Sequence, residues 1–249
     1  MHIAISDLHL SPEHPELLAG FQRLCMRLPT DTKSLWILGD LFDFWIGDDA
    51  PNPAAEGVIK ALRPLHARGV ELHFVPGNRD FLVGEHFAEL AQMKIHHDGK
   101  LLVINGRPTW LIHGDHLCID DKNYMAFRNV VRNRSWQQDF LGKPLEERLA
   151  MAHEARKLSS TENASKPEDI MDINDEFTVR QVKTHGALDL IHGHTHRPAF
   201  HPLGEEGTRY VLGDWRDGQA VICQWDNDSA PVLKRLDYTA EDASLGTPL

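Results

Sequence analysis

Long apolar runs are missing from this chain of 249 residues. No apolar stretch approaches the ~20 residues that a membrane-spanning helix needs, so we expect no transmembrane segment. The chain starts with Met-His-Ile-Ala-Ile-Ser-Asp, which has no basic region before its apolar residues and therefore argues against a secretory signal. The length suffices for one large domain, or for one domain with an insertion, around a sizeable buried core.

Cysteine is scarce as well. Only Cys25, Cys118 and Cys223 occur, an odd number without any Cys-x-x-Cys spacing. This usage argues against a disulfide framework and predicts reduced thiols that fill the core of a protein in a cytosol-like compartment. Because no thiolate pairs occur, the sequence also disfavours a purely structural zinc site.

Positive charge is in deficit, since 26 Lys and Arg residues against 37 Asp and Glu residues leave a formal net charge of -11. This balance argues against nucleic acid as a partner, because binding it requires a basic surface. Histidine, in contrast, is abundant with 16 residues, most of which we interpret as ordinary surface or packed side chains. The sequence indicates no particular protein partner.

The order of apolar and polar segments predicts an α/β fold. Short apolar runs bounded by Gly or Pro indicate buried strands, and apolar residues at helical spacing indicate helices between them. We expect strands at 2–6, 35–38, 71–75, 101–104, 109–113, 188–192, 210–212 and 219–225, and helices at 15–28, 54–68 and after Arg79. The dipeptide Asn105-Gly106 predicts a hairpin turn, and the polar tail after Asp237 is expected to be frayed.

Residues 120–170 interrupt this alternation with helical patterns and no predicted strand. We therefore predict a core formed by residues 1–119 and 171–249. Residues 120–170 would form a helical insertion that acts as a cap over the active site.

Five apolar runs of the core end at side chains that bind metal ions. These side chains are Asp7, His9, Asp40, Asn78, His113, His194 and His196. In open α/β sheets, ligands bind in the crevice beyond the carboxyl ends of the strands, so these oxygen and nitrogen donors are expected to meet in one place. They are enough for two divalent metal ions, and the sequence therefore predicts a dinuclear metal hydrolase.

The donor types also indicate the chemistry. Mn²⁺, Zn²⁺ and Fe²⁺ accept imidazole and carboxylate ligands, and Asp40 is the preferred bridge because a carboxylate can bind two cations where a histidine cannot. Two ions ~3.5–4 Å apart can activate water as the nucleophile and stabilise a phosphoryl oxygen. Any single Asp-x-His or His-x-His pair is weak evidence, and an aspartate at a strand end is often a turn or helix cap. Five such coincidences in one chain argue against that alternative.

The motifs that contain these residues are Asp7-x-His9, Gly39-Asp40-x-x-Asp43, Gly77-Asn78-Arg79-Asp80, His113 and Gly193-His194-x-His196. In type and order they resemble the calcineurin-like metallophosphoesterases, over essentially the whole core. The resemblance implies a four-layer α-β-β-α sandwich. It also implies two metal sites, one formed by Asp7, His9, Asp40 and His196 and the other by Asp40, Asn78, His113 and His194. We expect Asp43 and Asp80 to orient the ligands rather than bind metal.

One position departs from the family's pattern, because Arg79 follows Asn78 where most members have histidine. Arginine is permanently charged and cannot act as a general acid near neutral pH, but it can clamp a phosphate oxygen in bidentate fashion. A leaving group that receives no proton must have a low pKa, as a phosphate released from a pyrophosphate has. We therefore expect a pyrophosphate substrate, with Asp40, Asn78, Arg79 and His113 as the catalytic residues.

Longer motifs at 39–47, 77–81 and 113–121 narrow the resemblance. They resemble a bacterial branch of the family that hydrolyses a UDP-activated, diacylated glucosamine at its α-phosphorus, usually with Mn²⁺, in lipid A synthesis. This branch implies a peripheral location on the cytoplasmic face of the bacterial inner membrane. The implied substrate contacts are Asn78, Arg79, Asp121, Ser159, Asn163, Lys166 and His194. For Ser159 and Asn163, helix capping or loop polarity remains the alternative.

The segment 122–157 favours a lipid-bearing substrate on separate grounds. It has eight basic and four acidic residues, with aromatic residues such as Phe127, Trp136 and Phe140 between them. A segment of this kind suits the surface of an anionic membrane, and helices above the metal site can supply an apolar groove for acyl chains. The alternative is that these helices pack on the core with solvated charges, and the sequence leaves both open.

Two further functions compete with a lipid-pathway hydrolase. One is a broader nucleotide pyrophosphatase or dinucleoside polyphosphate hydrolase of the same family, and the other is a metal-stabilised scaffold without turnover. Arg79 and the basic, aromatic insertion favour the lipid-bearing substrate, because a soluble one needs no such cap. The presence of all candidate ligands argues against the scaffold.

Overall fold

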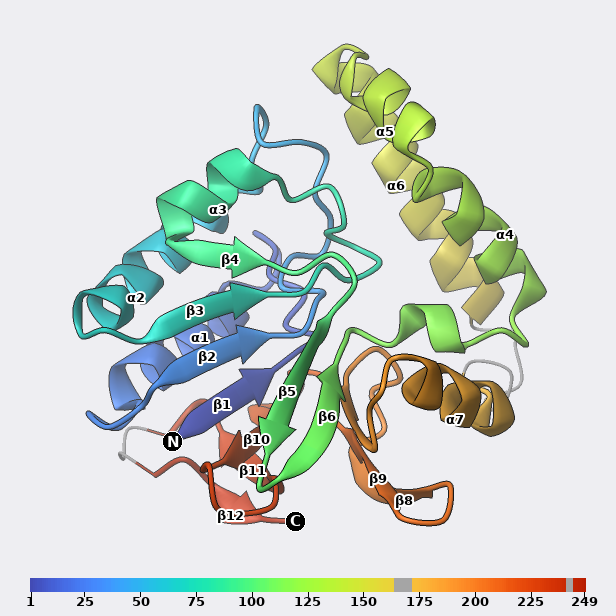
Figure 1. The fold of residues 1–249 in the computed structure, drawn as a ribbon. Coiled ribbons are helices and arrows are strands. Elements are labelled where there is room, and N and C mark those ends of the chain that lie inside the picture. The colour runs from blue at the N-terminus through green and yellow to red at the C-terminus, as the bar shows by residue number, and fades with distance from the viewer. Residues whose placement is uncertain (164–171, 241–243) are drawn as a thin grey trace.

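The structure is a computed structural model that describes residues 1–163, 172–240 and 244–249, without the side chains of residues 159–163. Two β-sheets lie face to face, and helices cover their outer sides (Figure 1). This arrangement confirms the predicted α/β class.

The first sheet has seven strands in the order β12-β11-β10-β1-β2-β3-β4. Their bounds are β1 (His2–Ile5), β2 (Ser34–Ile37), β3 (Glu71–Phe74), β4 (Met93–Ile95), β10 (Gln219–Trp225), β11 (Val232–Asp237) and β12 (Thr247–Pro248). Strands β1 to β4 are parallel to one another, whereas β10 to β12 pair in antiparallel fashion. Parallel strands buried on both faces are typically continuous apolar runs, which is why β1 and β2 could be predicted from sequence.

The second sheet has five strands in the order β5-β6-β7-β9-β8. Their bounds are β5 (Lys100–Ile104), β6 (Arg107–Leu111), β7 (Asp189–His192), β8 (Ala199–Leu203) and β9 (Gly207–Val211). Strands β6, β7 and β9 are parallel, and the two edge strands are antiparallel to their neighbours. In the turn between β5 and β6, Asn105 and Gly106 have φ of 50° and 73°, as the predicted hairpin requires.

Three apolar clusters fill the spaces between four layers. The helices are α1 (Pro15–Arg27), α2 (Ala55–Ala67), α3 (Glu85–Ala91), α4 (Lys122–Val131), α5 (Arg134–Leu141), α6 (Leu145–Asn163), α7 (Asp175–Thr184) and the short 3-10 helix η1 (Asp115–Leu117). One cluster joins α1 to α3 with the first sheet and contains Ile3 and Phe21. The second lies between the sheets around Trp36, and the third joins the second sheet to α7 through Leu190 and Val182. The order of layers is therefore α-β-β-α.

Helices α4, α5 and α6 stand at one side of the two sheets, at the upper right of Figure 1. Residues 122–163 are helical without a strand, in keeping with the helical pattern of this segment. The limits of an insertion at 120–170, and its action as a cap, stay predictions. Within the three described ranges, no helix is long and apolar enough to cross a membrane.

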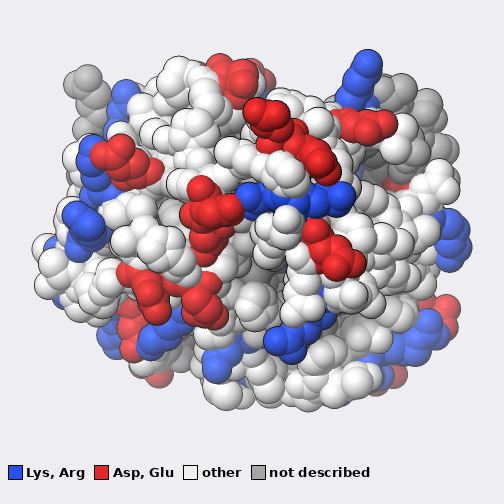
Figure 2. Space-filling view, turned by 90° about the horizontal axis from the view of Figure 1, so that it is seen from above, with Lys and Arg blue, Asp and Glu red and all other residues white. Residues whose placement is uncertain are grey.

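Charged side chains of both signs are interspersed on the face that looks upward from the view of Figure 1. Figure 2 shows Lys and Arg beside Asp and Glu across this face, rather than one continuous basic field over its described residues. The distribution of charge therefore does not mark this face as a binding surface for an anionic partner.

Strands β4, β8, β11 and β12 escaped the sequence-based prediction. Strand β4 has only three residues, and β8 contains Pro202, which disfavours a strand assignment. The expectation of a frayed tail after Asp237 was wrong for its described residues. Tyr238 is buried against Trp215, with ring centroids 5.2 Å apart, and β12 pairs with β11.

Candidate metal centre

The predicted ligands lie just beyond strands whose carboxyl ends meet at one edge of the molecule. Asp7, Asp40 and Asn78 follow β1, β2 and β3 of the first sheet, whereas His113 and His194 follow β6 and β7 of the second. The site therefore takes its side chains from both sheets.

The backbone at the ligands is strained. Five of them have a left-handed φ between 50° and 70°, which non-glycine residues rarely adopt: Asp7, His9, Asp40, His194 and His196. Strain of this kind costs on the order of 1–3 kcal/mol per residue and accumulates at functional sites. Its concentration at the predicted ligands is independent support for a functional role.

Asp7, His9 and His196 form the first candidate group, because each can offer one ligand atom within 4.8 Å of the others. The Nε2 atoms of His9 and His196 lie 3.3 Å apart, and His196 Nε2 lies 3.4 Å from Asp7 Oδ1. Asp7 is fully buried, and its Oδ2 accepts hydrogen bonds from Ser6 Oγ at 2.6 Å and from the backbone N–H of His194 at 2.9 Å.

Asp40 lies between this group and the remaining ligands. Its Oδ2 is 3.9 Å from His9 Nδ1, and its Oδ1 is 3.6 Å from His113 Nε2. Asn78 Oδ1 lies 2.9 Å from His113 Nε2, and the ring of His194 stands edge-on to His113 with centroids 5.1 Å apart. The structure thus brings all seven predicted ligands together, although their role as ligands stays a prediction.

Further side chains orient these groups. Asp80 accepts hydrogen bonds from the backbone N–H groups of Gly77 and Leu41 at 2.8 and 2.7 Å. Gly77 precedes Asn78 and Leu41 follows Asp40, so Asp80 connects the two loops that carry these candidate ligands, as expected for an orienting residue. Asp43, in contrast, pairs with Arg156 of α6. Asp214, which the sequence did not single out, lies 3.5 Å from Nδ1 of His196. Such partners of metal-binding histidines fix the orientation of the ring.

The protonation of the histidines differs across the cluster. Burial lowers the pKa of His9 and of His194 to about 4, so both rings are neutral near pH 7, which is the form that binds metal. For His196, burial acts in the same direction, but its hydrogen bonds to Asp214 and Asp7 outweigh it and raise the pKa to about 10. A metal ion at His196 must therefore displace a proton.

Comparison with known proteins agrees with this geometry. Residues 3–198 match the family described as calcineurin-like phosphoesterase. The chain belongs to this family. Its relatives include proteins named UDP-2,3-diacylglucosamine hydrolase from Neisseria meningitidis serogroup C, 46% identical over 228 residues and covering 91% of this chain and 94% of the relative. A protein of the same name from Chromohalobacter salexigens is 40% identical over 241 residues, covering 96% and 98% of the two chains. The resemblance in the motifs is thereby confirmed.

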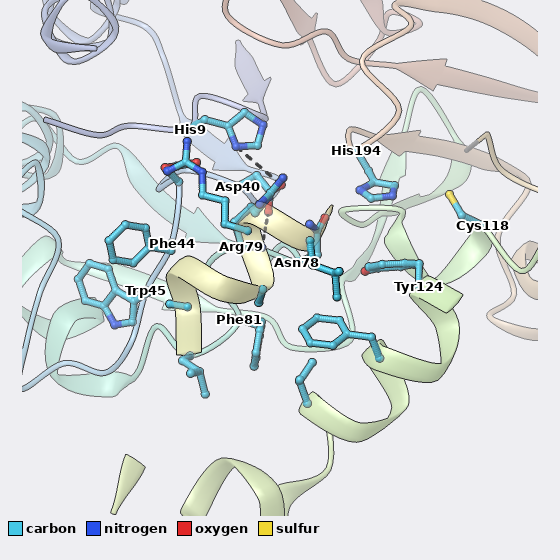
Figure 3. Close-up of a pocket in the computed structure, with 18 of the residues that line it drawn as sticks. His9, Asp40, Phe44, Trp45, Asn78, Arg79, Phe81, Cys118, Tyr124 and His194 are labelled. Carbon is cyan, nitrogen blue, oxygen red and sulfur yellow. Dashed lines mark hydrogen bonds and ion pairs between the residues drawn. The ribbon is translucent and has the colours of Figure 1, made fainter. Parts of the chain in front are cut away.

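One cavity of about 550 Å³ connects the ligand cluster of this phosphoesterase to an apolar chamber. His9, Asp40 and His194 line its polar end, close to Asn78 and Arg79 (Figure 3). Its apolar walls come from the core and from α4 to α6: Phe44, Trp45, Ile46, Phe81, Leu82, Phe127, Val131, Trp136, Phe140, Met151 and Leu158. Ligand pockets of this size and character bind small molecules with a few placed polar groups.

The predicted substrate contacts fall into two sets. Asn78, Arg79, Asp121 and His194 all line the cavity of this phosphoesterase. Asp121 also caps α4, because its side chain accepts from the N–H of Tyr124 at 3.0 Å. Ser159 and Asn163 belong to α6, but their side chains, like Lys166 as a whole, lie outside the described residues.

Tyr124 of α4 is a wall residue that the sequence analysis did not single out. Its ring lies beside that of His194 in Figure 3, with centroids 5.9 Å apart, and its hydroxyl donates to Asp115 at 2.8 Å. Tyr124, Phe127 and Val131 share a face of α4 and line the cavity. The helical spacing of these three residues could have been read from the sequence and indicates an apolar face of a helix. Spacing alone does not show whether such a face contacts the core or lines a cavity.

Proposed function

We propose that this phosphoesterase hydrolyses the pyrophosphate bond of UDP-2,3-diacylglucosamine, releasing UMP and 2,3-diacylglucosamine 1-phosphate. The observation that carries the proposal is the continuity of one cavity from the ligand cluster to the apolar chamber beneath α4 to α6. A metal centre alone suits many phosphoesters. The attached chamber suits a substrate that joins a pyrophosphate to acyl chains, as the name of the relatives at 40 and 46% identity describes.

The strand-end residues fit two divalent metal ions, because their donors are carboxylate, amide and imidazole groups on a strained backbone. Asp7, His9, Asp40 and His196 would hold one ion, and Asp40, Asn78, His113 and His194 the other. Asp40 suits the bridging position because its two oxygens face His113 and His9. When bound, the ions, with Mn²⁺ as our candidate, stabilise charge on a phosphoryl oxygen and lower the pKa of the attacking water.

Arg79 would hold the pyrophosphate at the centre. Its backbone N–H donates to Asp40 Oδ1 at 2.9 Å, so its position is tied to the proposed bridge. A guanidinium can bind two phosphate oxygens at once and offset their charge. Water attacks the α-phosphorus and releases a proton to the solvent, and the bond from that phosphorus to the oxygen between the two phosphorus atoms breaks. The sugar 1-phosphate then leaves without needing a proton from Arg79.

The other end of the cavity would accept the acyl chains, and the polar contacts proposed for the sugar and phosphates include Asp121, Ser159, Asn163 and Lys166. Helices α4 to α6 also carry exposed apolar side chains: Phe127, Val130, Leu141, Leu145, Leu149, Met151 and Leu158. We propose that these helices meet the anionic cytoplasmic surface of the bacterial inner membrane, where the substrate's acyl chains reside during lipid A synthesis.

Hydrolysis of UDP-diacylglucosamine and of UDP-glucose, each measured with Mn²⁺, tests the function. We expect kcat/KM to be at least about 100-fold higher for the lipid substrate, because burial of acyl chains supplies binding energy that UDP-glucose lacks. Equal values would favour the broader nucleotide pyrophosphatase. In ¹⁸O water the label should enter UMP, and label in the sugar phosphate would contradict attack at the α-phosphorus.

A further inference from the structure

Arg132, directly after α4, reaches from the helices beside the cavity to the loop that carries Asn78 and Arg79. Its Nη2 donates a hydrogen bond to the carbonyl oxygen of Gly77 at 2.8 Å and lies 3.5 Å from Asp115 Oδ2. Its guanidinium also lies 5.0 Å from the ring centroid of Phe81, within range of a cation-π contact. Three neighbours therefore fix one side chain.

The peptide that Arg132 holds has little freedom. The N–H of Gly77 donates to Asp80 at 2.8 Å, and the N–H of Arg79 donates to Asp40 at 2.9 Å. A Cβ on Gly77 would lie only 2.1 Å from Asp40 Oδ1, so the loop is packed directly against that carboxylate. A shift of the Gly77 carbonyl would therefore change how Asn78 and Arg79 sit relative to Asp40.

Arg132 is not among the described residues that line the cavity of about 550 Å³, and it borders a separate cavity of about 270 Å³ behind α4. It would therefore act on the substrate only through the loop. This separates it from Arg79, which lines the main cavity.

Arg128 provides a matched comparison. It lies four residues earlier on α4, its Nε donates to the same Asp115 oxygen at 2.7 Å, and its side chain is 21% exposed against 20% for Arg132. The two arginines lie one helical turn apart, at the end of α4, and share charge, counter-ion and exposure. They differ in that Arg132 also holds the Gly77 carbonyl and lies over the ring of Phe81.

We propose that Arg132 is a positioning residue for the reaction, which sets the placement of Arg79 through the Gly77 carbonyl, with Asp115 as its counter-ion. Through this contact the position of α4, which forms one wall of the chamber, is linked to the loop that binds phosphate. The inference rests on the proposed function, because it concerns turnover of the same substrate.

The test compares Arg132→Gln, Arg132→Lys and Arg128→Gln on UDP-diacylglucosamine. We expect kcat/KM to fall at least about 10-fold in Arg132→Gln, since a small misplacement of a binding group costs rate steeply. Arg128→Gln should stay within about threefold of the wild type, and Arg132→Lys should recover part of the loss, because its ammonium can still donate to Gly77. Thermal unfolding of each variant shows whether it is folded. If Arg132→Gln does not fold, the activity of Arg132→Lys provides the test instead.

A double-mutant cycle with Arg79→Ala separates positioning from simple anchoring of the helix. If Arg132 acts through Arg79, Arg132→Gln should lower kcat/KM by a clearly smaller factor in the Arg79→Ala background than in the wild type. Equal losses in the two glutamine variants, or an undiminished loss in the Arg79→Ala background, would overturn the proposal. A wild-type enzyme that does not hydrolyse the lipid substrate would instead refute the proposed function.

Discussion

At the scale of single residues, the site combines side chains that the sequence could identify with others that it could not. The seven candidate ligands could be identified because each ends an apolar strand, and parallel strands bring their carboxyl ends together. Asp214 and Arg132 follow no such rule, since their positions depend on how a distant loop and the end of α4 pack. The left-handed backbone at Asp7 and Asp40 was likewise beyond sequence reasoning, because aspartate does not require it.

Asp40→Ala should lower turnover of the lipid substrate by at least about 10³-fold, because it removes the carboxylate that faces both His9 and His113. Activity is to be measured alongside the metal content of the purified variant. Asp31→Ala, which removes an exposed carboxylate near the opposite end of β2, serves as the control and should retain full activity. Substantial turnover by a metal-loaded Asp40→Ala enzyme would rule out the bridging role.

At the scale of elements, helices α4 to α6 supply much of the apolar lining of the cavity. Their helical nature could be predicted from periodicity, but their apolar spacing fits packing on the core and lining a chamber equally well. The structure gives them both roles, because Phe140 belongs to the core cluster and also lines the cavity. Ion pairs connect them to the loops after β2 and β6, among them those of Arg156 with Asp43 and Arg148 with Asp49, and those of Arg128 and Arg132 with Asp115.

Phe127→Ala should lower kcat/KM for UDP-diacylglucosamine about 10-fold and leave that for UDP-glucose unchanged, because the ring lines the chamber rather than the ligand cluster. Phe127 is 47% exposed, so the variant should fold normally. Leu90→Ala, which truncates a 43% exposed leucine on α3, is the control for loss of surface apolar area. Equal losses on both substrates would show that Phe127 does not contact the acyl chains.

At the scale of the whole molecule, the ligand cluster lies where the two sheets meet and takes residues from both. Asp7 and Asp40 come from the first sheet, and His113 and His194 come from the second. Ions bound there would therefore connect the layers in addition to serving catalysis. Because they bind the folded state and not the unfolded one, they should stabilise it.

Removal of metal by a chelator should accordingly lower the melting temperature. Saturation at about 100 times the dissociation constant contributes roughly 2.7 kcal/mol, which corresponds to a shift of about 5–10 °C for a chain of this size. Calorimetry with and without added Mn²⁺ measures it. In Asp40→Ala the shift should be at most about half as large, and an equal shift would mean that the ions bind elsewhere.

The ligands His9 and His196 lie 187 positions apart in the chain, although their ring nitrogens are 3.3 Å apart. A growing polypeptide that has emerged only as far as α6 has β1 to β6 but neither His194 nor His196. The metal centre therefore cannot be completed until about four fifths of the chain has been synthesised. Hydrolytic activity should thus be one of the last properties acquired on the ribosome, well after the parallel strands of the first sheet are available to pair.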